Sequence, residues 1–309
     1  MIVVGVDENG LGPLLGPMVV TACAFRTPSA DPEYLWRLRT PDLPADDSKV
    51  VFARNRLARG ETATLRWLSL FGVRPAHYAA LASALCAPPL VPLPCAGAGH
   101  ASCMPAPDVS LPLWADPQTA ALPDDTARAV ARNLNDLGVV PLALRLHALC
   151  PGEFNAVLAP GDINKFRLDL SLMVGLVLHI ASRESGAPVL AICGKVGGMK
   201  SYLPWLSACA TGDWEVLQEH PQESAYRLDH RVTFRFIKDG DAAHLPVAVA
   251  SMVGKYFREL AMHQLNRTWR PEGRPVSGYR DRLTAAFVDE TAPQRARAQF
   301  PDACFLRRR

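Results

Sequence analysis

Residues 1–13 read MIVVGVDENGLGP, and this stretch determines which fold we expect. Its first half is a β-branched run, which is typical of a buried strand. The run ends on two adjacent acids, Asp7 and Glu8, although isolated buried charge is unfavourable unless it is paired or bound to metal. Gly10 and Gly12 follow, and glycine lets a backbone approach a ligand closely. Taken alone, the stretch suggests a cation site beside a phosphate, but an ordinary solvated loop is the simpler account.

Beyond this stretch the pattern alternates between strands and helices. We expect further strands near residues 18–25, 64–73, 139–148, 189–192, 213–219 and 231–237. We expect helices near residues 50–59, 77–86, 124–137, 163–182 and 246–269. This order predicts an α/β fold in which helices flank a mixed sheet.

The composition changes after Cys86, where prolines are frequent and no period is sustained. Such a stretch is typical of an elaborated loop. We therefore predict a single domain over residues 1–309 with an insertion at residues 86–150. Four side chains in the insertion could bind zinc: Cys86, Cys95, His100 and Cys103. Their spacing lacks the paired C-x-x-C form, so a structural zinc and an unmetallated proline-rich excursion both stay open.

The overall composition is that of a globular protein, with 49% hydrophobic and 20% charged residues. A net charge of +3 permits nucleic-acid binding without requiring it. The longest apolar stretch, Leu168 to Ala181, is interrupted by Asp169 and His179 and is shorter than the roughly 20 residues of a membrane helix. No basic leader precedes the first strand, and the cysteines are too sparse for a disulfide scaffold. We expect a soluble, monomeric, cytoplasmic protein without a membrane partner.

Three further segments carry polar or glycine residues where one element gives way to the next. Residues 46–49 read DDSK before a helix, which helix capping alone would also explain. Cys193 and Gly194 open a glycine-containing turn after a buried strand. Asp241 lies shortly before the helix expected from Pro246, where an acidic capping region is the simplest account.

Together these segments resemble the ordered signature of the type-2 ribonucleases H, the bacterial ribonuclease HII and HIII enzymes. The signature is Asp-Glu-x-Gly-x-Gly-Pro, then Asp-Ser-Lys, then Gly-Asp-Ala-x-x-Leu-x-x-Ala-x-Ala-Ser before a helix. The resemblance implies a diverged member with a ribonuclease H-like mixed sheet flanked by helices. It also implies a metal-dependent endonuclease that cleaves RNA in RNA–DNA hybrids, or in duplexes containing ribonucleotides. In such enzymes carboxylates hold two Mg²⁺ or Mn²⁺ ions that promote hydrolysis.

By this resemblance Asp7, Glu8 and Asp241 are the metal ligands and the catalytic residues. The family's remaining ligand is an Asp in a strand-end Asp-Gly pair, and the matching pair here is Cys193-Gly194. Thiolate is a poor ligand for Mg²⁺, and a free Cys in an apolar strand is also typical of a small buried hydrophobe. Three readings stay open: an enzyme working on three carboxylates, one using the softer Mn²⁺, or a binding protein that has lost turnover.

The resemblance also implies substrate contacts. The backbone of Gly10-Leu11-Gly12 would recognise the ribose 2′-OH, which distinguishes RNA from DNA. Leu11 replaces the polar residue that the family often has between the glycines. The other expected substrate contacts are Lys49, Lys255 and Tyr279, each of which could instead be an ordinary surface residue. Residues 270–309 would form a substrate-contacting segment that ends in a basic tail, for which we expect a solvated terminus, with phosphate contact as the alternative.

Overall fold

The computed structural model describes residues 1–53, 56–91, 109–161, 163–184, 186–196 and 199–308. Within them, seven strands form one sheet in the order β3-β2-β1-β4-β7-β6-β5. The strands are β1 (Ile2–Asn9), β2 (Met18–Arg26), β3 (Val140–Leu149), β4 (Val189–Gly194), β5 (Trp214–Glu219), β6 (Glu223–Leu228) and β7 (Val232–Ile237). The β1–β4 and β4–β7 pairs are parallel, and all the other pairs in this sheet are antiparallel.

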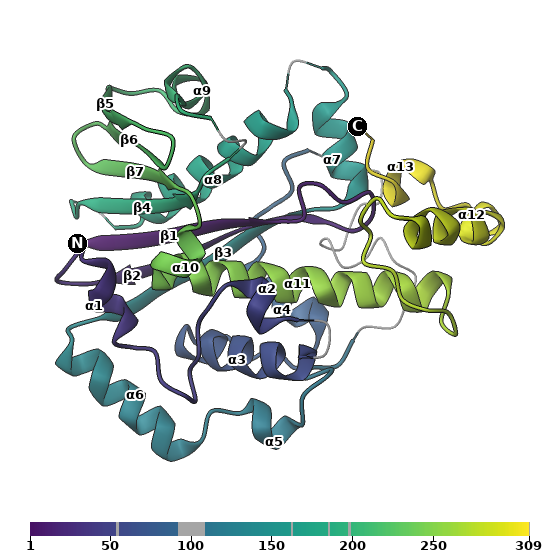
Figure 1. Cartoon of the computed structure of the whole chain (residues 1–309), viewed down its shortest axis with the longest axis horizontal. Coiled ribbons are helices and arrows are strands. Elements are labelled where there is room, and N and C mark those ends of the chain that lie inside the picture. The colour runs from purple at the N-terminus through teal and green to yellow at the C-terminus, as the bar shows by residue number, and fades with distance from the viewer. Residues whose placement is uncertain (54–55, 92–108, 162, 185, 197–198, 309) are drawn as a thin grey trace.

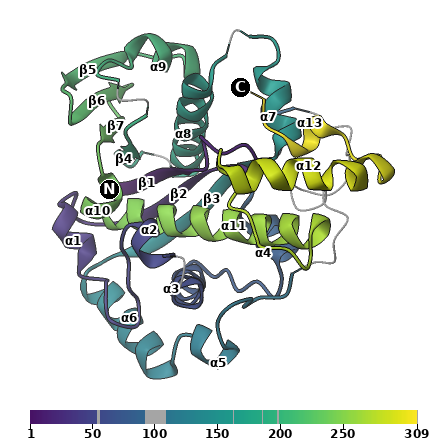
Figure 2. The same ribbon diagram turned by 45° about the vertical axis from the view of Figure 1, so that its right-hand side comes forward.

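Helices cover both faces of this sheet, which confirms the predicted mixed α/β fold. They are α1 (Pro32–Trp36), α2 (Ser48–Val51), α3 (Leu57–Leu70), α4 (Tyr78–Leu85), α5 (Pro117–Ala120), α6 (Asp124–Asp136), α7 (Pro151–Leu158), α8 (Lys165–Ser182), α9 (Leu203–Cys209), α10 (Gly240–Ala243), α11 (Leu245–Trp269), α12 (Arg282–Arg297) and α13 (Asp302–Phe305). Helix α11 runs along one face and α8 along the other (Figure 1, Figure 2). None of these helices is both long and apolar enough to cross a membrane.

Strand β1 is buried on both faces, as its apolar run predicted. Val3 joins the core beneath α11, whereas Val4 and Val6 join the core beneath α8. This alternation explains the nearly continuous apolar sequence of a central parallel strand. A third, smaller core lies between the end of α11 and the C-terminal helices, where Met262 packs with Phe287.

Helix α11 lies directly on β1 because two positions lack side chains. A Cβ at Gly5 would lie 2.1 Å from the carbonyl carbon of Pro246. A Cβ at Gly254 would lie 2.7 Å from Thr21 Oγ1 on β2. These close approaches fix the helix along β1 and β2, with its start against Gly5 and its Ser251 beside Asp7.

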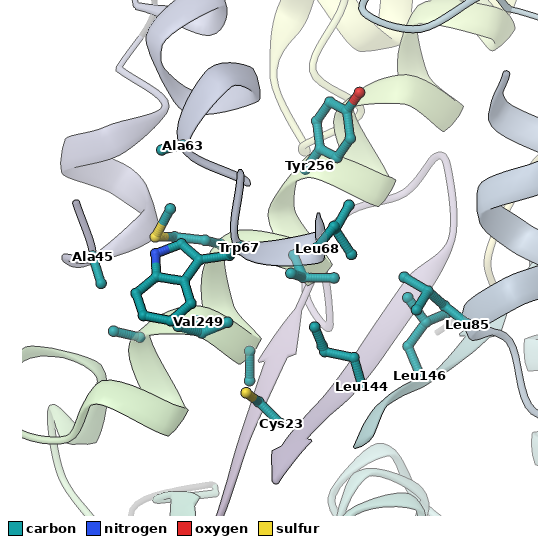
Figure 3. Packing of buried hydrophobic residues seen from close by; sticks show 14 of the residues in the cluster. Cys23, Ala45, Ala63, Trp67, Leu68, Leu85, Leu144, Leu146, Val249 and Tyr256 are labelled. Atoms are coloured by element: carbon teal, nitrogen blue, oxygen red, sulfur yellow. The ribbon is translucent and has the colours of Figure 1, made fainter. Parts of the chain in front are cut away.

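The strand predicted at residues 64–73 is wrong, because this segment belongs to helix α3. Its buried residues follow the helical spacing i, i+3, i+4, i+7, i+8: Gly60, Ala63, Thr64, Trp67 and Leu68. Figure 3 shows Trp67 next to Val249 of α11, in a core that also includes Leu68 and Leu144. The Trp67 indole donates to the carbonyl of Pro44 at 2.9 Å, which satisfies its polar group.

Two other expectations need adjustment. The region between the predicted strands at 213–219 and 231–237 contains the unpredicted β6, which pairs with both β5 and β7. Within the predicted insertion at 86–150, residues 92–108 lie outside the described residues, while β3 at its end pairs with β2 as an edge strand of the sheet. The end of this range is therefore part of the central fold.

A solvated C-terminal tail is also wrong for two of its arginines. Arg295 and Arg307 are only 3% and 1% exposed. The Arg295 guanidinium donates to the carbonyl of Val288 at 3.0 Å and lies 3.9 Å from the ring centre of Phe305. The tail is folded back against the domain, and Arg307 reaches the glycine turn after β1.

Candidate metal centre

The acidic residues predicted for the site lie at one edge of the sheet. Because β1, β4 and β7 are parallel, their carboxyl ends share this edge, which is where α/β folds place ligands. Asp7 and Glu8 end β1, and Asp241 lies in α10, shortly after β7. Residues far apart in the sequence are thus brought together, and the charges of Asp7 and Asp241 interact.

Asp7 faces α11. Burial raises the pKa of its carboxyl to about 7, and the nearby Asp241 carboxylate adds to this rise. A hydrogen bond with Ser251 of α11 and the charge of Lys49 oppose it. The amide nitrogen of the Asn9 side chain lies 3.4 Å from Asp7 Oδ2. A nearby cation would stabilise the buried Asp7 carboxylate, because positive charge favours the ionised form of an acid.

The Asp-Ser-Lys segment reaches the same place through α2. Ser251 Oγ donates to Ser48 Oγ at 3.0 Å, which joins α11 to α2. Asp47 caps α2 by accepting from the Lys49 backbone N–H. Burial raises the pKa of Asp241, the charge of Asp47 adds to the rise, and the exposed Lys49 opposes it. The segment therefore both caps a helix and borders the acidic cluster.

Glu8 belongs to the other face of the strand, toward α8, because side chains alternate along β1. Burial raises the pKa of Glu8 to about 7, and the charge of Asp7 adds to the rise. The Leu11 backbone N–H donates to Glu8 Oε1, and the nearby Arg307 and Arg258 guanidinium groups oppose the rise. This hydrogen bond of Glu8 links the acidic end of β1 to the glycine turn.

The two glycines of the turn have different surroundings. Gly10 has a φ of +93°, and a Cβ there would lie 2.6 Å from Arg258 Nε. Arg307 Nη1 donates to the carbonyl of Gly10 at 2.6 Å. A Cβ at Gly12 would meet nothing within 4 Å. Packing within the protein requires glycine at position 10, whereas the side of Gly12 is open to solvent or a ligand.

Strand β4 places its two candidate residues on opposite faces. Cys193 pairs with Val6, is fully buried among apolar residues beneath α8, and has a pKa raised by burial. The register therefore makes Gly194 the neighbour of Asp7, and a Cβ at Gly194 would lie 3.2 Å from Asp7 Oδ1. The position beside Asp7 that lacks a carboxylate is Gly194, and Cys193 behaves as a small core residue.

Sequence reasoning missed a further acid near Asp7 and Glu8, the buried Asp169 in α8. Its side chain is 2% exposed, and Oδ1 has no hydrogen-bond partner among the described residues. Burial raises its pKa well above the usual range, and the charges of Glu8 and Asp7 add to the rise. A signal was present, because Asp169 interrupts the longest apolar stretch of the chain, but that stretch alone does not show what the side chain faces.

The residues expected to contact the substrate differ in their exposure to solvent. Tyr279 is 48% exposed, with the Arg258 guanidinium carbon 5.4 Å from its ring centre. Lys255 forms an ion pair with Glu259 at 2.6 Å and lines a groove of about 580 Å³ that also touches Ser277. Leu11 is partly buried against the core beneath α8.

The described residues contain no ready-made group of three or more His, Cys, Asp or Glu side chains around a metal position. The acidic side chains are therefore near one another, but those described do not surround a single metal position. Of the possible zinc ligands, Cys95, His100 and Cys103 lie outside the described residues. Burial raises the pKa of Cys86 to about 12, and the charge of Glu153 adds to the rise. The zinc alternative stays a prediction.

Comparison with known proteins finds no family model that matches the chain. A stretch of 78 residues is 37% identical to ribonuclease HII of Gluconobacter oxydans (strain 621H), which confirms the resemblance read from the motifs. This stretch is 25% of the chain and spans only 34% of that relative.

Solved structures were also compared over the whole chain. Ribonuclease HII in its PCNA complex from Archaeoglobus fulgidus is 14% identical, with a TM-score of 0.46 over 100% of this chain and 95% of that one. Ribonuclease H2 of Pyrococcus horikoshii OT3 is 15% identical, with a TM-score of 0.44 over 100% of this chain and 93% of that one. The Mn²⁺ complex of Bst-RNase HIII is 17% identical, with a TM-score of 0.42 over 98% and 64%.

Proposed function

We propose that this protein is a divalent-metal-dependent nuclease of the ribonuclease H type. Its substrate would be the RNA strand of an RNA–DNA hybrid, or a duplex containing ribonucleotides. The observation that carries the proposal is the meeting of Asp7, Glu8 and Asp241 at one sheet edge, beside the open Gly12 turn. The sequence relation to a ribonuclease HII supports the same class of activity. A cytoplasmic location and a monomeric state stay predictions.

The donor set fits Mg²⁺ or Mn²⁺, which prefer carboxylate oxygens. Asp7, Glu8 and Asp241 would hold the ions, and burial raises the pKa of each, which a bound cation would offset. When bound, such ions supply Lewis-acid activation of water and of the scissile phosphate. Ser251 would orient Asp7, and Lys49 would balance part of the negative charge.

Recognition of the substrate would come from the surface next to these acids. The backbone around Gly12 has room for close approach of a ribose, and a contact to its 2′-OH would select RNA. The exposed ring of Tyr279, backed by Arg258, offers a stacking surface for a sugar or base. Lys49 and Lys255 supply positive charge for the phosphate backbone.

A second candidate is a hybrid-binding protein without turnover. The observation that favours it is Gly194, which leaves strand β4 without an acidic side chain next to Asp7. This candidate predicts salt-dependent binding of the hybrid and no cleavage with either metal.

The decisive experiment is cleavage of a labelled RNA–DNA hybrid with Mg²⁺ and with Mn²⁺, using the wild type and Asp7→Asn. We expect Asp7→Asn to reduce cleavage by at least about a hundredfold, because it removes a charged ligand at the centre of the cluster. Asp136→Asn, at an exposed acid on α6, is the matched control and should cleave like the wild type.

Cleavage that survives undiminished in Asp7→Asn would overturn the assignment of the site. Tight hybrid binding without cleavage by the wild type would support the second candidate instead.

A further inference from the structure

We propose that Asp169 of α8 supplies the carboxylate that strand β4 lacks, and that it binds the divalent cation together with Glu8 and Asp7. This inference rests on the proposed function and adds a ligand to it. The ligand comes from a different element, on the face of β1 opposite to α11.

The missing carboxylate is a consequence of the register of β4. Gly194 is the residue beside Asp7, and it carries no side chain. Cys193 cannot serve instead, because its thiol is buried in the core beneath α8 and is a poor ligand for a hard cation. On the α8 face, where Cys193 lies, a carboxylate must therefore come from another element.

Asp169 has the placement that such an acid needs. It lies four residues into α8, whose inner face packs against β1 and β2. The carboxyl is 2% exposed, and Oδ1 has no hydrogen-bond partner among the described residues. A buried polar atom without a partner is unfavourable and therefore needs an explanation.

The groups around Asp169 point to a cation as that explanation. The charges that act on it are those of Glu8 and Asp7, which repel it. Cys193 and Tyr202 also lie within range of its charge, but the Tyr202 hydroxyl donates to the carbonyl of Val196 at 2.9 Å. Three acids that repel one another in a buried place are stabilised together by a shared divalent ion.

The charges around Glu8 also agree with a cation bound between Glu8 and Asp169. Arg258 and Arg307 already lower the pKa of Glu8 from one side, near the glycine turn. On the other side, the charges that raise the pKa of Asp169 are those of Glu8 and Asp7. A cation bound between Glu8 and Asp169 would balance this second side.

The test is Mn²⁺ binding to the full chain, measured by calorimetry and by the electron paramagnetic resonance of free Mn²⁺. We expect Asp169→Asn, which preserves the shape of the side chain, to weaken Mn²⁺ binding by at least about tenfold, as loss of even an outer partner of a metal site can do. The rise in melting temperature on adding Mn²⁺ should shrink in the same variant. Asp136→Asn is again the matched control and should bind like the wild type.

A second variant tests the position as well as the residue. Cys193→Asp, introduced into the Asp169→Asn background, should restore Mn²⁺ binding, because it places a carboxylate of β4 on the same face as Asp169. Circular dichroism and the melting temperature without metal check that each variant folds.

The results separate this inference from the proposed function. Mn²⁺ binding that is equal in the wild type and in Asp169→Asn would overturn the role of Asp169, even if hybrid cleavage by the wild type confirms the nuclease. Mn²⁺ binding that depends on Asp169 would support the role, even if no hybrid is cleaved. Absence of Mn²⁺ binding to the folded wild type would overturn it outright.

Discussion

Gly10 and Gly12 are two residues apart, yet they are glycines for different reasons. Gly10 combines a left-handed backbone with a close approach to Arg258, so its lack of a side chain is a requirement of the fold. Gly12 has neither constraint, since a Cβ there would meet only open space. We interpret the second glycine as a requirement of substrate binding.

This difference gives a paired prediction. Gly10→Ala should lower the free energy of unfolding by about 1–3 kcal/mol, through backbone strain and the clash with Arg258. Gly12→Ala should change it by less than about 1 kcal/mol but should weaken hybrid cleavage and the preference for RNA over DNA. Urea unfolding and cleavage assays on both variants measure these effects. Equal losses of stability in the two variants would contradict the distinction.

The site was only partly predictable at the level of single residues. Asp7, Glu8 and Asp241 were identified from motifs, because the signature preserves their order along the chain. The face of β4 that Cys193 occupies could not be predicted, because it depends on the register with β1. Asp169 is near Glu8 through tertiary packing alone, and no local motif marks it.

Helix α11 is the element that assembles the site, because its start lies against β1 and its Ser251 meets both Asp7 and Ser48. The position of this helix depends on Gly5, which allows the backbone of Pro246 to come within contact of the strand. The same helix carries Arg258 below the glycine turn. One packing contact therefore influences every part of the candidate centre.

We expect Gly5→Ala to lower the free energy of unfolding by about 3 kcal/mol or more, because the new methyl group would overlap backbone atoms that cannot rotate away. Gly175→Ala is the matched control. Position 175 lies in α8 with no neighbour within 4 Å of a Cβ, so this change should raise stability by about 0.5–1 kcal/mol. Urea unfolding checks both values, and a neutral Gly5→Ala would show that α11 can move without loss.

The prediction of elements succeeded where the period was long or the strand was central, as in β1, β4, α8 and α11. It failed for α3, where a short local alternation looked like a strand although the buried residues follow a helical spacing. It missed β6, whose pairing with β5 and β7 is a property of the sheet rather than of the segment. Both errors arise because local patterns do not specify packing partners.

At the scale of the whole molecule, the buried acids make stability depend on pH. In the metal-free protein, Asp7 and Glu8 have pKa values of about 7, above their values of 3.8 and 4.5 outside the fold. At pH values between the unfolded and the folded pKa values, the folded state therefore binds more protons than the unfolded state. The free energy of unfolding decreases as the pH rises through this range.

We expect the protein in EDTA to be less stable at pH 8 than at pH 5, by on the order of 1–3 kcal/mol. The raised pKa of Asp241 increases this loss of stability. The charges of Lys49, Arg258 and Arg307 lower the pKa values of the acids and so reduce the loss. Urea unfolding at several pH values measures the slope, and saturating Mn²⁺ should reduce it. A metal-free protein that becomes more stable toward pH 8 would contradict the assigned burial of these acids.

The contact between Arg307 and the carbonyl of Gly10 joins residues 297 positions apart. On a ribosome that adds about 5–20 residues per second, the turn is synthesised on the order of 15–60 seconds before its arginine. The glycine turn and Glu8 thus spend this interval without the guanidinium that later holds them. The nascent chain can therefore complete this corner of its candidate centre only after residue 307 has left the exit tunnel.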